Sequence, residues 1–581
     1  MKRVACILLL VLGTGEVKAQ YFFRGTVTDN RGDKLQYVKI TSQSSGNIYR
    51  SNVQGGFGFN GAVPFDTIYF SYDGYETVTR VLKANEHNTI VLNALPVSAI
   101  FKKNHLSSIA AVKKDSARVR HFYNETYNKS RENIFLFTDE APVISFSANI
   151  NRASYSNVRR FINDMDGPVP ADAVRIEEML NYFNFHYREP EKDSMFSFSS
   201  VITQCPWNPA SQLLLLNVCA QKINTEHLPA SNLVFLIDVS GSMDMPNKLP
   251  LLKAGFRMLV KNLRAIDTVS IVTYGETVEV PLEAIAGSEK EKITAAIDAL
   301  TADGPTPGEA GIKLAYHVAQ KHFIKGGNNR IFLGADGDFN VGMNTEKELE
   351  NLIEYQKQSG VYLTCLGVGM GNYKDSKLAV LSQMGNGNFA YLDNEQEAEK
   401  VLVSELTQTL FTVADNVYIS VAFNPSTVVA YRLTGYDNDH KAHADTNMRI
   451  EGGEIGSGHS LMAVFELLPL TDSNTTGNIL ADIKVQYSLP GLRNIYSTGI
   501  VCPNNYTPWI KTAPDIKKAV AVVLFGMKLR QSVYSQKVSW KKLNTLCRTA
   551  FDPNNYIEKE LLELVEKAQK LYRKKRKYSL R

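Results

Sequence analysis

Cysteine is scarce in this chain, and its cysteines are not spaced for metal or redox chemistry. Only six occur in 581 residues, and none form a Cys-x-x-Cys pair. This sparse use argues against a disulfide scaffold and against zinc or thiol-redox motifs. Cys205 and Cys219 are the two that a hairpin could bring face to face. Cys365 lies in an apolar strand, where we expect a small core residue.

Long apolar runs are also missing, except at the beginning of the chain. Residues 1–19 contain the positive pair Lys2 and Arg3, an apolar stretch at 4–13 and a small residue before Gln20. That order is typical of a secretory signal peptide, and the apolar stretch is too short to span a bilayer. No later segment has 18 uninterrupted apolar residues. We therefore expect an exported protein without a transmembrane span, located in the periplasm, at the cell surface or in the medium.

Strong charge and familiar catalytic motifs are absent as well. The formal net charge of +5 is concentrated in basic residues near the C-terminus, so the body of the chain is slightly acidic and no nucleic-acid partner is indicated. We expect the basic tail at 572–581 to be a solvated, frayed end, with contact to anionic lipid as the alternative. No P-loop, Gly-x-Ser-x-Gly or His-Glu-x-x-His motif occurs, which argues against the enzyme classes that use them.

The most informative segment present is an apolar run that ends in oxygen-bearing side chains. Residues 233–237 are all apolar, as in a strand buried on both faces of a parallel sheet. Asp238, Ser240 and Ser242 follow directly and place one carboxylate and two hydroxyls at alternate positions. Oxygen ligands of this kind suit a hard divalent cation.

Two later loops supply further oxygen ligands. Thr306 lies in a turn-rich segment that opens a helix, and Asp336 follows another apolar strand. Strands and helices alternate through residues 229–410, which predicts a largely parallel, doubly wound sheet. In such sheets ligands bind beyond the carboxyl ends of the strands, so we expect the three segments to meet at one edge.

The order of these residues resembles a known family. An Asp-x-Ser-x-Ser strand end, a later Thr and a later Asp-Gly are similar to the metal-ion-dependent adhesion site of von Willebrand factor type A domains. The resemblance implies that a partner protein's carboxylate completes the coordination of Mg²⁺, or of Mn²⁺ or Ca²⁺. The implied metal ligands are Asp238, Ser240, Ser242, Thr306 and Asp336.

The flanking segments extend the resemblance. Residues 20–93 alternate in short strands and resemble the carboxypeptidase-regulatory-like β-sandwich of exported Bacteroidetes proteins. The motifs Arg-Ile-Glu-Glu-Met at 175–179 and Cys-Pro-Trp-Asn-Pro at 205–209 resemble bacterial YfbK-type von Willebrand factor A proteins. The expected parts are a signal peptide (1–19), a β-sandwich (20–93), a linker (94–138), a flanking domain (139–228), the α/β domain (229–410), a β-sandwich (411–505), a helical region (506–571) and the basic tail (572–581).

The strand-rich flanks predict an insertion. Strands at 196–220 and at 411–505 are each few for a sandwich of their own, so we expect them to pair with one another around the α/β domain. The His459 loop lacks a serine or cysteine partner motif, so we expect a structural histidine there.

The leading functional hypothesis is a non-enzymatic, metal-dependent protein-binding module of the bacterial envelope. One alternative is a structural envelope protein whose metal site is inactive. Another is a Mg²⁺-dependent phosphohydrolase that uses Asp238 as its nucleophile. That chemistry needs a second acid two residues later, where this chain has Ser240.

The export hypothesis has a direct test. The mature chain should begin near Gln20, because the charged, apolar and small-residue order of residues 1–19 is what signal peptidase removes. N-terminal sequencing of the envelope and secreted fractions measures this. Recovery of the chain with Met1 intact from the cytosol would contradict it.

Overall fold

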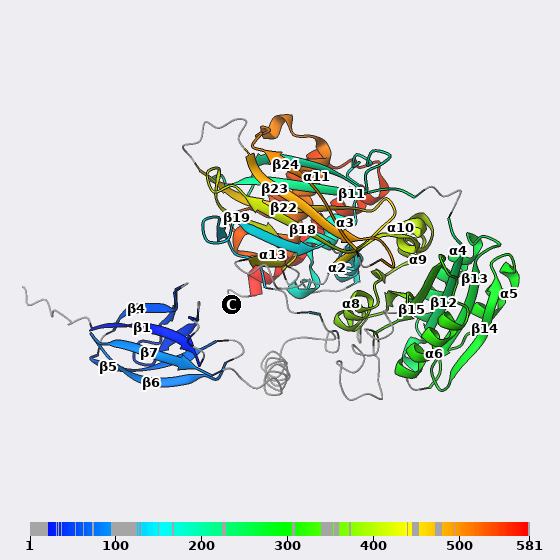
Figure 1. The fold of residues 1–581 in the computed structure, drawn as a ribbon, viewed down its shortest axis with the longest axis horizontal. Helices are drawn as coiled ribbons and strands as arrows, with labels where there is room; N and C mark the ends of the chain where they lie inside the picture. The colour runs from blue at the N-terminus through cyan, green and yellow to red at the C-terminus, as the bar shows by residue number, and fades with distance from the viewer. Residues whose placement is uncertain are drawn as a thin grey trace, which may run out of the picture. The chain divides into compact units, whose positions relative to one another are not determined.

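In the computed structural model the chain forms two compact units (Figure 1). The first unit lies within Met1–Arg120 and the second within His121–Arg581. The described residues are 21–93 and 125–578, apart from gaps at 31, 33, 36–37, 53, 62, 73–74, 126, 129–130, 149, 165–167, 224–227, 305–307, 338–352, 354–358, 371–372, 438–439, 444–451, 471–478 and 493.

The first unit is a small β-sandwich, as expected for the N-terminal region. One sheet has the order β4-β1-β7 and the other the order β3-β2-β5-β6. Alternate residues of these strands point inward, and Phe23, Ile68 and Phe70 are fully buried between the sheets. The strands are β1 (Tyr21–Asp29), β2 (Lys39–Ser42), β3 (Ile48–Arg50), β4 (Gly56–Gly61), β5 (Phe65–Ser71), β6 (Val78–Lys83) and β7 (His87–Leu92).

The second unit contains the predicted doubly wound domain. Its six-stranded sheet has the order β14-β13-β12-β15-β16-β17, and every neighbouring pair is parallel except β13 with β14. The strands are β12 (Ser231–Asp238), β13 (Thr268–Tyr274), β14 (Val278–Ala286), β15 (Asn328–Ala335), β16 (Tyr362–Val368) and β17 (Phe389–Leu392).

Helices cover both faces of this sheet, as Figure 1 shows for α4 and α6. Phe235 packs with Phe256 of α4 in one core, while Val234 packs with Ile312 of α6 in the core on the opposite face. Of the segment between β15 and β16, residues 338–352 and 354–358 lie outside the described residues. The described helices are α4 (Leu249–Lys261), α5 (Lys290–Asp298), α6 (Gly308–Lys321), α8 (Asp375–Met384), α9 (Glu395–Glu399), the π-helix η4 (Lys400–Ser404) and α10 (Leu406–Leu410).

The α/β domain is inserted in a β-sandwich, which confirms the predicted topology. Strand β11 precedes the domain and pairs with β22 after it, Leu215 opposite Val464. The sandwich sheets have the orders β10-β11-β22-β19-β8 and β20-β9-β18-β23-β24, and β21 pairs with β18. The strands are β8 (Leu136–Phe137), β9 (Val143–Ser147), β10 (Phe196–Gln204), β11 (Gln212–Ala220), β18 (Thr412–Phe423), β19 (Val428–Thr434), β20 (His440–His443), β21 (Gly453–Gly456), β22 (Ser460–Pro469), β23 (Ile479–Ser488) and β24 (Ile495–Pro503).

A single turn holds both connections of the inserted domain. The Ser457 hydroxyl accepts a hydrogen bond from the Ile223 amide at 2.9 Å, on the way into the domain. The Ser457 amide donates to the Phe411 carbonyl at 2.8 Å, on the way out. His459 is buried in this turn, where its Nδ1 lies 3.2 Å from the Gly456 amide, as expected for a structural histidine.

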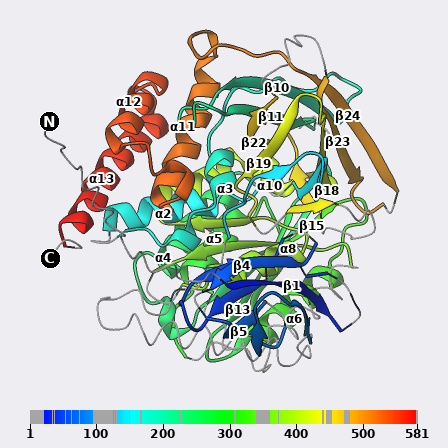
Figure 2. The same ribbon diagram turned by 90° about the vertical axis from the view of Figure 1, so that its left-hand side faces the viewer.

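Helices from both ends of the second unit pack on the sandwich as one layer. Figure 2 shows α11, α12 and α13 together on one side of it. Ile176 and Met179 of the Arg-Ile-Glu-Glu-Met motif are buried against Gly526. The helical segments are α2 (Ala153–Asp164), η1 (Ala171–Ala173), α3 (Ile176–Asn181), η5 (Trp509–Lys511), α11 (Pro514–Leu529), η6 (Val533–Ser535), α12 (Trp540–Ala550) and α13 (Tyr556–Tyr578).

Helix α2 also covers one edge of the α/β sheet. The Ser156 hydroxyl donates to the Tyr391 carbonyl at 2.7 Å, and the Phe389 amide donates to Asn151 Oδ1 at 3.0 Å. Arg159 adds an ion pair with Asp393 just beyond β17. Polar side chains around α2 therefore satisfy backbone groups of the edge strand.

Two expectations about segment boundaries were wrong. The linker was placed at 94–138, but β8 within it pairs with β19, and Asn133 donates to the Leu433 carbonyl at 3.0 Å. The tail at 572–581 was expected to fray, but α13 continues to Tyr578, and the Tyr572 hydroxyl donates to the Leu529 carbonyl at 2.8 Å. Lys and Arg are good helix formers and suit a helix C-terminus, so a basic run extends this helix.

The cysteines are buried and unpaired in the described residues. Cys219 lies opposite Ser197, at the open end of the β10–β11 hairpin. Cys205 lies beyond Gln204, at the turn end of the same hairpin, so the face-to-face arrangement considered above was wrong. Cys365 is fully buried in β16, which confirms its expected core position.

A buried ion pair explains part of the Cys-Pro-Trp-Asn-Pro motif. Glu466 Oε2 accepts from Arg432 at 2.7 Å and from the Trp207 indole N–H at 2.9 Å, and Asn208 donates to Oε1 at 3.1 Å. The positive charge of Arg432 lowers the pKa of Glu466 despite its burial. The Arg432 guanidinium also lies over the Tyr534 ring, 3.8 Å from its centroid.

Glu466→Gln should destabilise the sandwich by about 3 kcal/mol, because it leaves the buried charge of Arg432 with only the more distant and partly exposed carboxylate of Glu132, 3.5 Å away. Urea unfolding of the full chain, monitored by far-ultraviolet circular dichroism, measures the change. Asp482→Asn is the control, since its pair with Lys484 is exposed and should contribute about 1 kcal/mol or less. Equal effects of the two substitutions would show that the buried Arg432–Glu466 pair contributes no more than an exposed ion pair.

Candidate metal centre

Strand pairing brings the two predicted aspartates to the same edge of the sheet. Strands β12 and β15 run parallel, with Ile237 opposite Gly334. Asp238 is the last residue of β12, and Asp336 follows the end of β15. Because both strands end at this edge, the two carboxylates meet beyond their carboxyl ends, as the sequence predicted.

A continuous chain of polar contacts joins four of the five predicted residues. The Ser240 amide donates to Asp238 Oδ1 at 2.9 Å, and the Ser240 and Ser242 hydroxyl oxygens lie 3.3 Å apart. The Ser242 hydroxyl donates to Asp336 Oδ2 at 2.9 Å. Two carboxylates and two hydroxyls are therefore assembled in one place.

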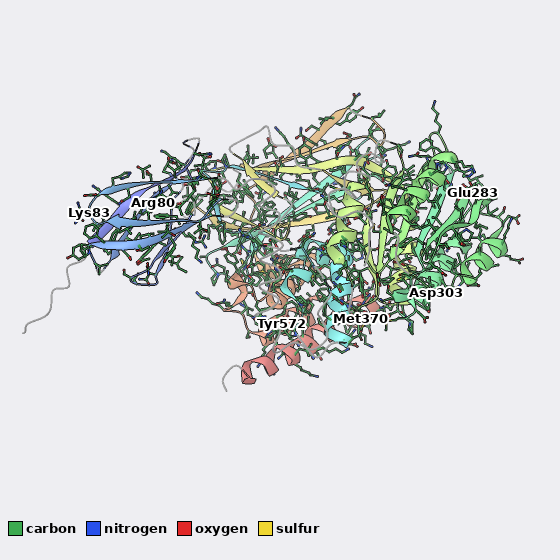
Figure 3. All side chains as sticks on the ribbon, turned by 90° about the horizontal axis from the view of Figure 1, so that it is seen from below. Arg80, Lys83, Glu283, Asp303, Met370 and Tyr572 are labelled. Carbon is green, nitrogen blue, oxygen red and sulfur yellow. The ribbon has the colours of Figure 1, made fainter. Side chains whose placement is uncertain are left out.

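The loop that carries Thr306 docks beside this cluster. The Asp303 amide donates to the Val239 carbonyl at 2.7 Å, and the Gly241 amide donates to the Gly304 carbonyl at 3.0 Å. Figure 3 labels Asp303 and Met370 toward the same side of the domain, away from Glu283. Thr306 itself lies outside the described residues, so its place as the fifth ligand stays a prediction.

The Asp238 carboxylate is buried and incompletely paired. It is fully inaccessible to solvent, and its Oδ2 has no hydrogen-bond partner among the described residues that meets ordinary geometry. Burial raises the pKa of the Asp238 carboxyl to about 7; hydrogen bonding from Ser240 and from the Tyr274 hydroxyl lowers it, and the nearby charge of Asp336 raises it. A buried carboxylate oxygen without a partner is costly unless a cation or proton satisfies it.

The donor set fits a hard divalent cation. Two carboxylates and two hydroxyls give only oxygen ligands, which Mg²⁺, Mn²⁺ and Ca²⁺ prefer. Within the described part of the chain, no cluster of three or more His, Cys, Asp or Glu residues is arranged to hold a metal. Any cation at this edge would therefore depend on neutral hydroxyls for much of its coordination.

A buried lysine was missed by the sequence analysis. Lys248 Nζ lies 2.9 Å from Asp336 Oδ2 and donates to the Ser242 carbonyl at 2.9 Å. It precedes α4, only six residues after Ser242. The signal available was a lysine next to the apolar start of a helix, which ordinarily indicates a solvated residue.

The described part of the chain contains no helix with both the length and the apolar character needed to cross a membrane.

Comparison with known proteins agrees with the fold and the strand-end motif. Residues 233–338 match the family model for the von Willebrand factor type A domain, and residues 121–215 match one described as von Willebrand factor. Residues 408–571 match the model for the C-terminal part of uncharacterized protein YfbK. The parallel sheet and its Asp-x-Ser-x-Ser strand end thus define a von Willebrand factor type A domain protein.

Comparison with curated proteins identifies the family to which the chain belongs. Uncharacterized protein YfbK of Escherichia coli (strain K12) is 38% identical over 455 residues, which are 74% of this chain and 78% of the relative. The chain belongs to the YfbK family of von Willebrand factor type A domain proteins. Uncharacterized protein sll0103 of Synechocystis sp. (strain ATCC 27184 / PCC 6803 / Kazusa) is 28% identical over 197 residues, covering 33% of this chain and 44% of the relative.

Solved structures are similar over parts of the chain. A von Willebrand factor type A structure from Catenulispora acidiphila has 11% identity and a TM-score of 0.38, over 62% of this chain and 88% of that one. The conserved hypothetical protein BatB from Bacteroides thetaiotaomicron has 17% identity and a TM-score of 0.26, over 30% of this chain and 97% of that one.

Metal binding at this edge should depend on pH. Because the Asp238 carboxyl has a pKa of about 7 without metal, binding at lower pH must displace its proton. Affinity for Mg²⁺ should therefore fall by up to about tenfold per pH unit below 7 and level off above pH 8. Calorimetric titration in two buffers of different ionisation enthalpy measures the released proton. An affinity that stays constant between pH 6 and pH 8 would refute this coupling.

Proposed function

We propose that this protein is a metal-ion-dependent, non-enzymatic binding module of the bacterial envelope. The observation that supports this most directly is the chain of contacts from Asp238 through the two serines to Asp336. It assembles an all-oxygen donor set at the edge where parallel sheets place their ligands. The predicted metal ligands are Asp238, Ser240, Ser242, Thr306 and Asp336.

The small number of carboxylates suits recognition of an external acid. Asp238 and Asp336 supply negative charge, while the serine hydroxyls supply neutral oxygen. A divalent cation held there would be balanced by no more than two carboxylates, and the neutral hydroxyl ligands would leave it electrophilic enough to attract a carboxylate from a partner. The partner class is therefore a protein with an exposed acidic side chain.

The other parts of the chain are assigned supporting roles. Residues 1–19 direct export, and the N-terminal sandwich, which we assign to the carboxypeptidase-regulatory-like class, serves as a spacer or docking unit. The sandwich around the inserted domain holds it through the Ser457 turn.

The phosphohydrolase alternative is disfavoured by the residue two positions after Asp238. A hydrolase of that class needs a general acid there, and Ser240 supplies only a hydroxyl and an amide that donates to the carboxylate. A phosphatase assay on the purified chain tests this alternative. The inactive-site alternative is tested by titration with metal.

Partner capture should require the divalent cation. The full chain immobilised in Mg²⁺ should retain an envelope protein that elutes in EDTA, and Asp238→Ala should abolish this while the fold survives. Ser240→Ala should weaken capture less, because it removes a neutral ligand. Asp298→Ala, which changes an exposed acid of the same domain, is the matched control. Capture that persists unchanged in EDTA would separate the function from this edge of the sheet.

A further inference from the structure

We propose that Lys248 is a built-in counter-charge of the metal centre, which makes cation binding depend on an acidic ligand. This inference rests on the proposed function, since it concerns the same edge of the sheet. It assigns a role to a residue outside the predicted ligand set. The class of ligand that it selects is a carboxylate or another compact anion.

The position of Lys248 is fixed by contacts at its head. Its ammonium lies 2.9 Å from Asp336 Oδ2, and this same oxygen accepts from the Ser242 hydroxyl at 2.9 Å. The ammonium also donates to the Ser242 carbonyl. Lys248 therefore contacts two of the predicted ligand residues directly, one through its carboxylate and one through its main chain.

The stem of Lys248 is enclosed as well. The side chain is 3% exposed and Asp336 is 0% exposed, so solvent screens the pair very little. A Cβ atom at Gly369 would lie 2.4 Å from Lys248 Cε, and Gly369 has a φ of +82°. A glycine at this position thus leaves room for the lysine stem, which cannot swing away without rearrangement of its surroundings.

The charges of the site decide what this lysine does. Asp238 and Asp336 together carry two negative charges when ionised, and the ammonium of Lys248 compensates one of them. A divalent cation added to this set leaves one net positive charge in a buried place. One carboxylate from a ligand restores neutrality, so cation and anion should strengthen each other's binding by the same factor.

Removal of the ammonium should weaken this coupling between cation and anion binding. With Lys248→Met the stem stays apolar and two carboxylates face the cation alone. Such a site should hold the cation more tightly without any ligand and gain less from one. A coupling of ordinary size corresponds to about 5- to 150-fold in affinity.

A metal titration with a simple anion tests the proposal. Mn²⁺ is titrated into the full chain, in sodium chloride and in sodium acetate of equal ionic strength. The concentration of free Mn²⁺ is measured by electron paramagnetic resonance. The unsubstituted chain should bind Mn²⁺ weakly in chloride and more tightly in acetate. Lys248→Met should bind more tightly in chloride, within the range given above, and show a smaller acetate effect.

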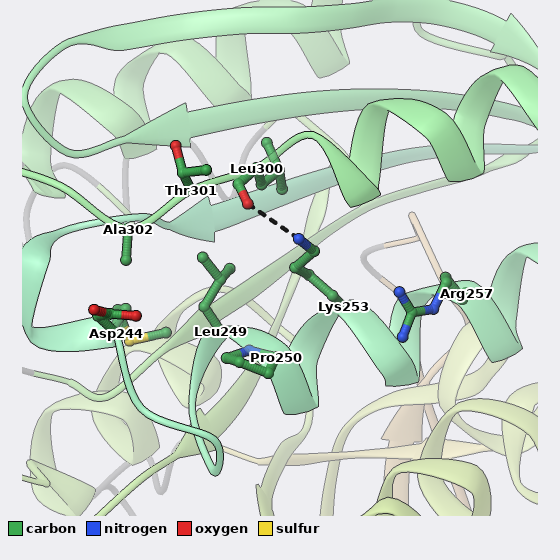
Figure 4. Close-up of a pocket in the computed structure, with 9 residues that line it drawn as sticks. Asp244, Leu249, Pro250, Lys253, Arg257, Leu300, Thr301 and Ala302 are labelled. Atoms are coloured by element: carbon green, nitrogen blue, oxygen red, sulfur yellow. Dashed lines mark hydrogen bonds between the residues drawn. The ribbon is translucent and has the colours of Figure 1, made fainter.

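Helix α4, which follows Lys248 directly, supplies a matched control. Lys253 Nζ donates to the carbonyls of Asp298 and Leu300 beside a neighbouring pocket of about 420 Å³ and contacts no predicted ligand (Figure 4). Lys253→Met should therefore leave Mn²⁺ binding unchanged in both salts. Lys248→Arg keeps the charge and should retain the acetate effect, which a purely steric role of the lysine would not require.

The outcomes separate this proposal from the function on which it rests. If the unsubstituted chain binds Mn²⁺ and Lys248→Met binds it equally or more weakly, Lys248 is not a counter-charge, although the metal centre stands. If neither binds Mn²⁺ in either salt, the metal centre itself is refuted, and this proposal with it. Binding by Lys248→Met alone, with none by the unsubstituted chain in acetate, would overturn the proposed dependence on an acidic ligand. Should Lys248→Met fail to fold, Lys248→Gln removes the charge, keeps a hydrogen-bonding head and carries the same expectation.

Discussion

The architecture of the second unit depends on one constraint: an inserted domain must leave and re-enter its host at nearly the same place. The Ser457 turn meets this constraint by bonding to Ile223 on the way in and to Phe411 on the way out. Pairing of β11 with β22 then closes the sandwich across the insertion. Because both connections are held at this turn, the α/β domain forms a complete sheet that shares no strand with the sandwich.

The candidate metal centre lies away from the connections of the inserted domain. Arg330, fully buried at the start of the sheet, donates to the Leu410 carbonyl at 3.3 Å, close to the exit from the domain. Asp238 and Asp336 lie at the opposite ends of their strands. The carboxyl ends of parallel strands are thus left for ligand binding, while the amino ends are used for attachment.

Most of the α/β domain could be predicted because its signals are local. The apolar run at 233–237 and the oxygen-bearing residues after it predict both strand β12 and three of the candidate ligands, Asp238, Ser240 and Ser242. The short strand β17 and helix α8 were missed, since four or ten residues with mixed polarity carry little periodicity. Strand β14 was also missed, and register shifts against β13 show that its alternation is irregular.

The contributions that sequence reasoning missed are long-range. The local sequence around Lys248 predicts a surface lysine. Only the three-dimensional structure shows that Asp336, after β15, is its buried partner and that Gly369, after β16, leaves space for its side chain. The end of the linker, which was expected at residue 138, was misplaced for a related reason. A two-residue strand such as β8 is defined by the neighbour it pairs with, β19, and not by its own pattern.

The covering of strand β17 by α2 also has a consequence for self-association. An uncovered edge strand offers its backbone as a template for another strand, and proteins suppress this in several ways. Here the Ser156 hydroxyl and the Asn151 amide group occupy backbone positions that an incoming strand would need. On that side the edge strand is covered by side chains of the same polypeptide. A further strand therefore cannot pair with β17 unless helix α2 is displaced first.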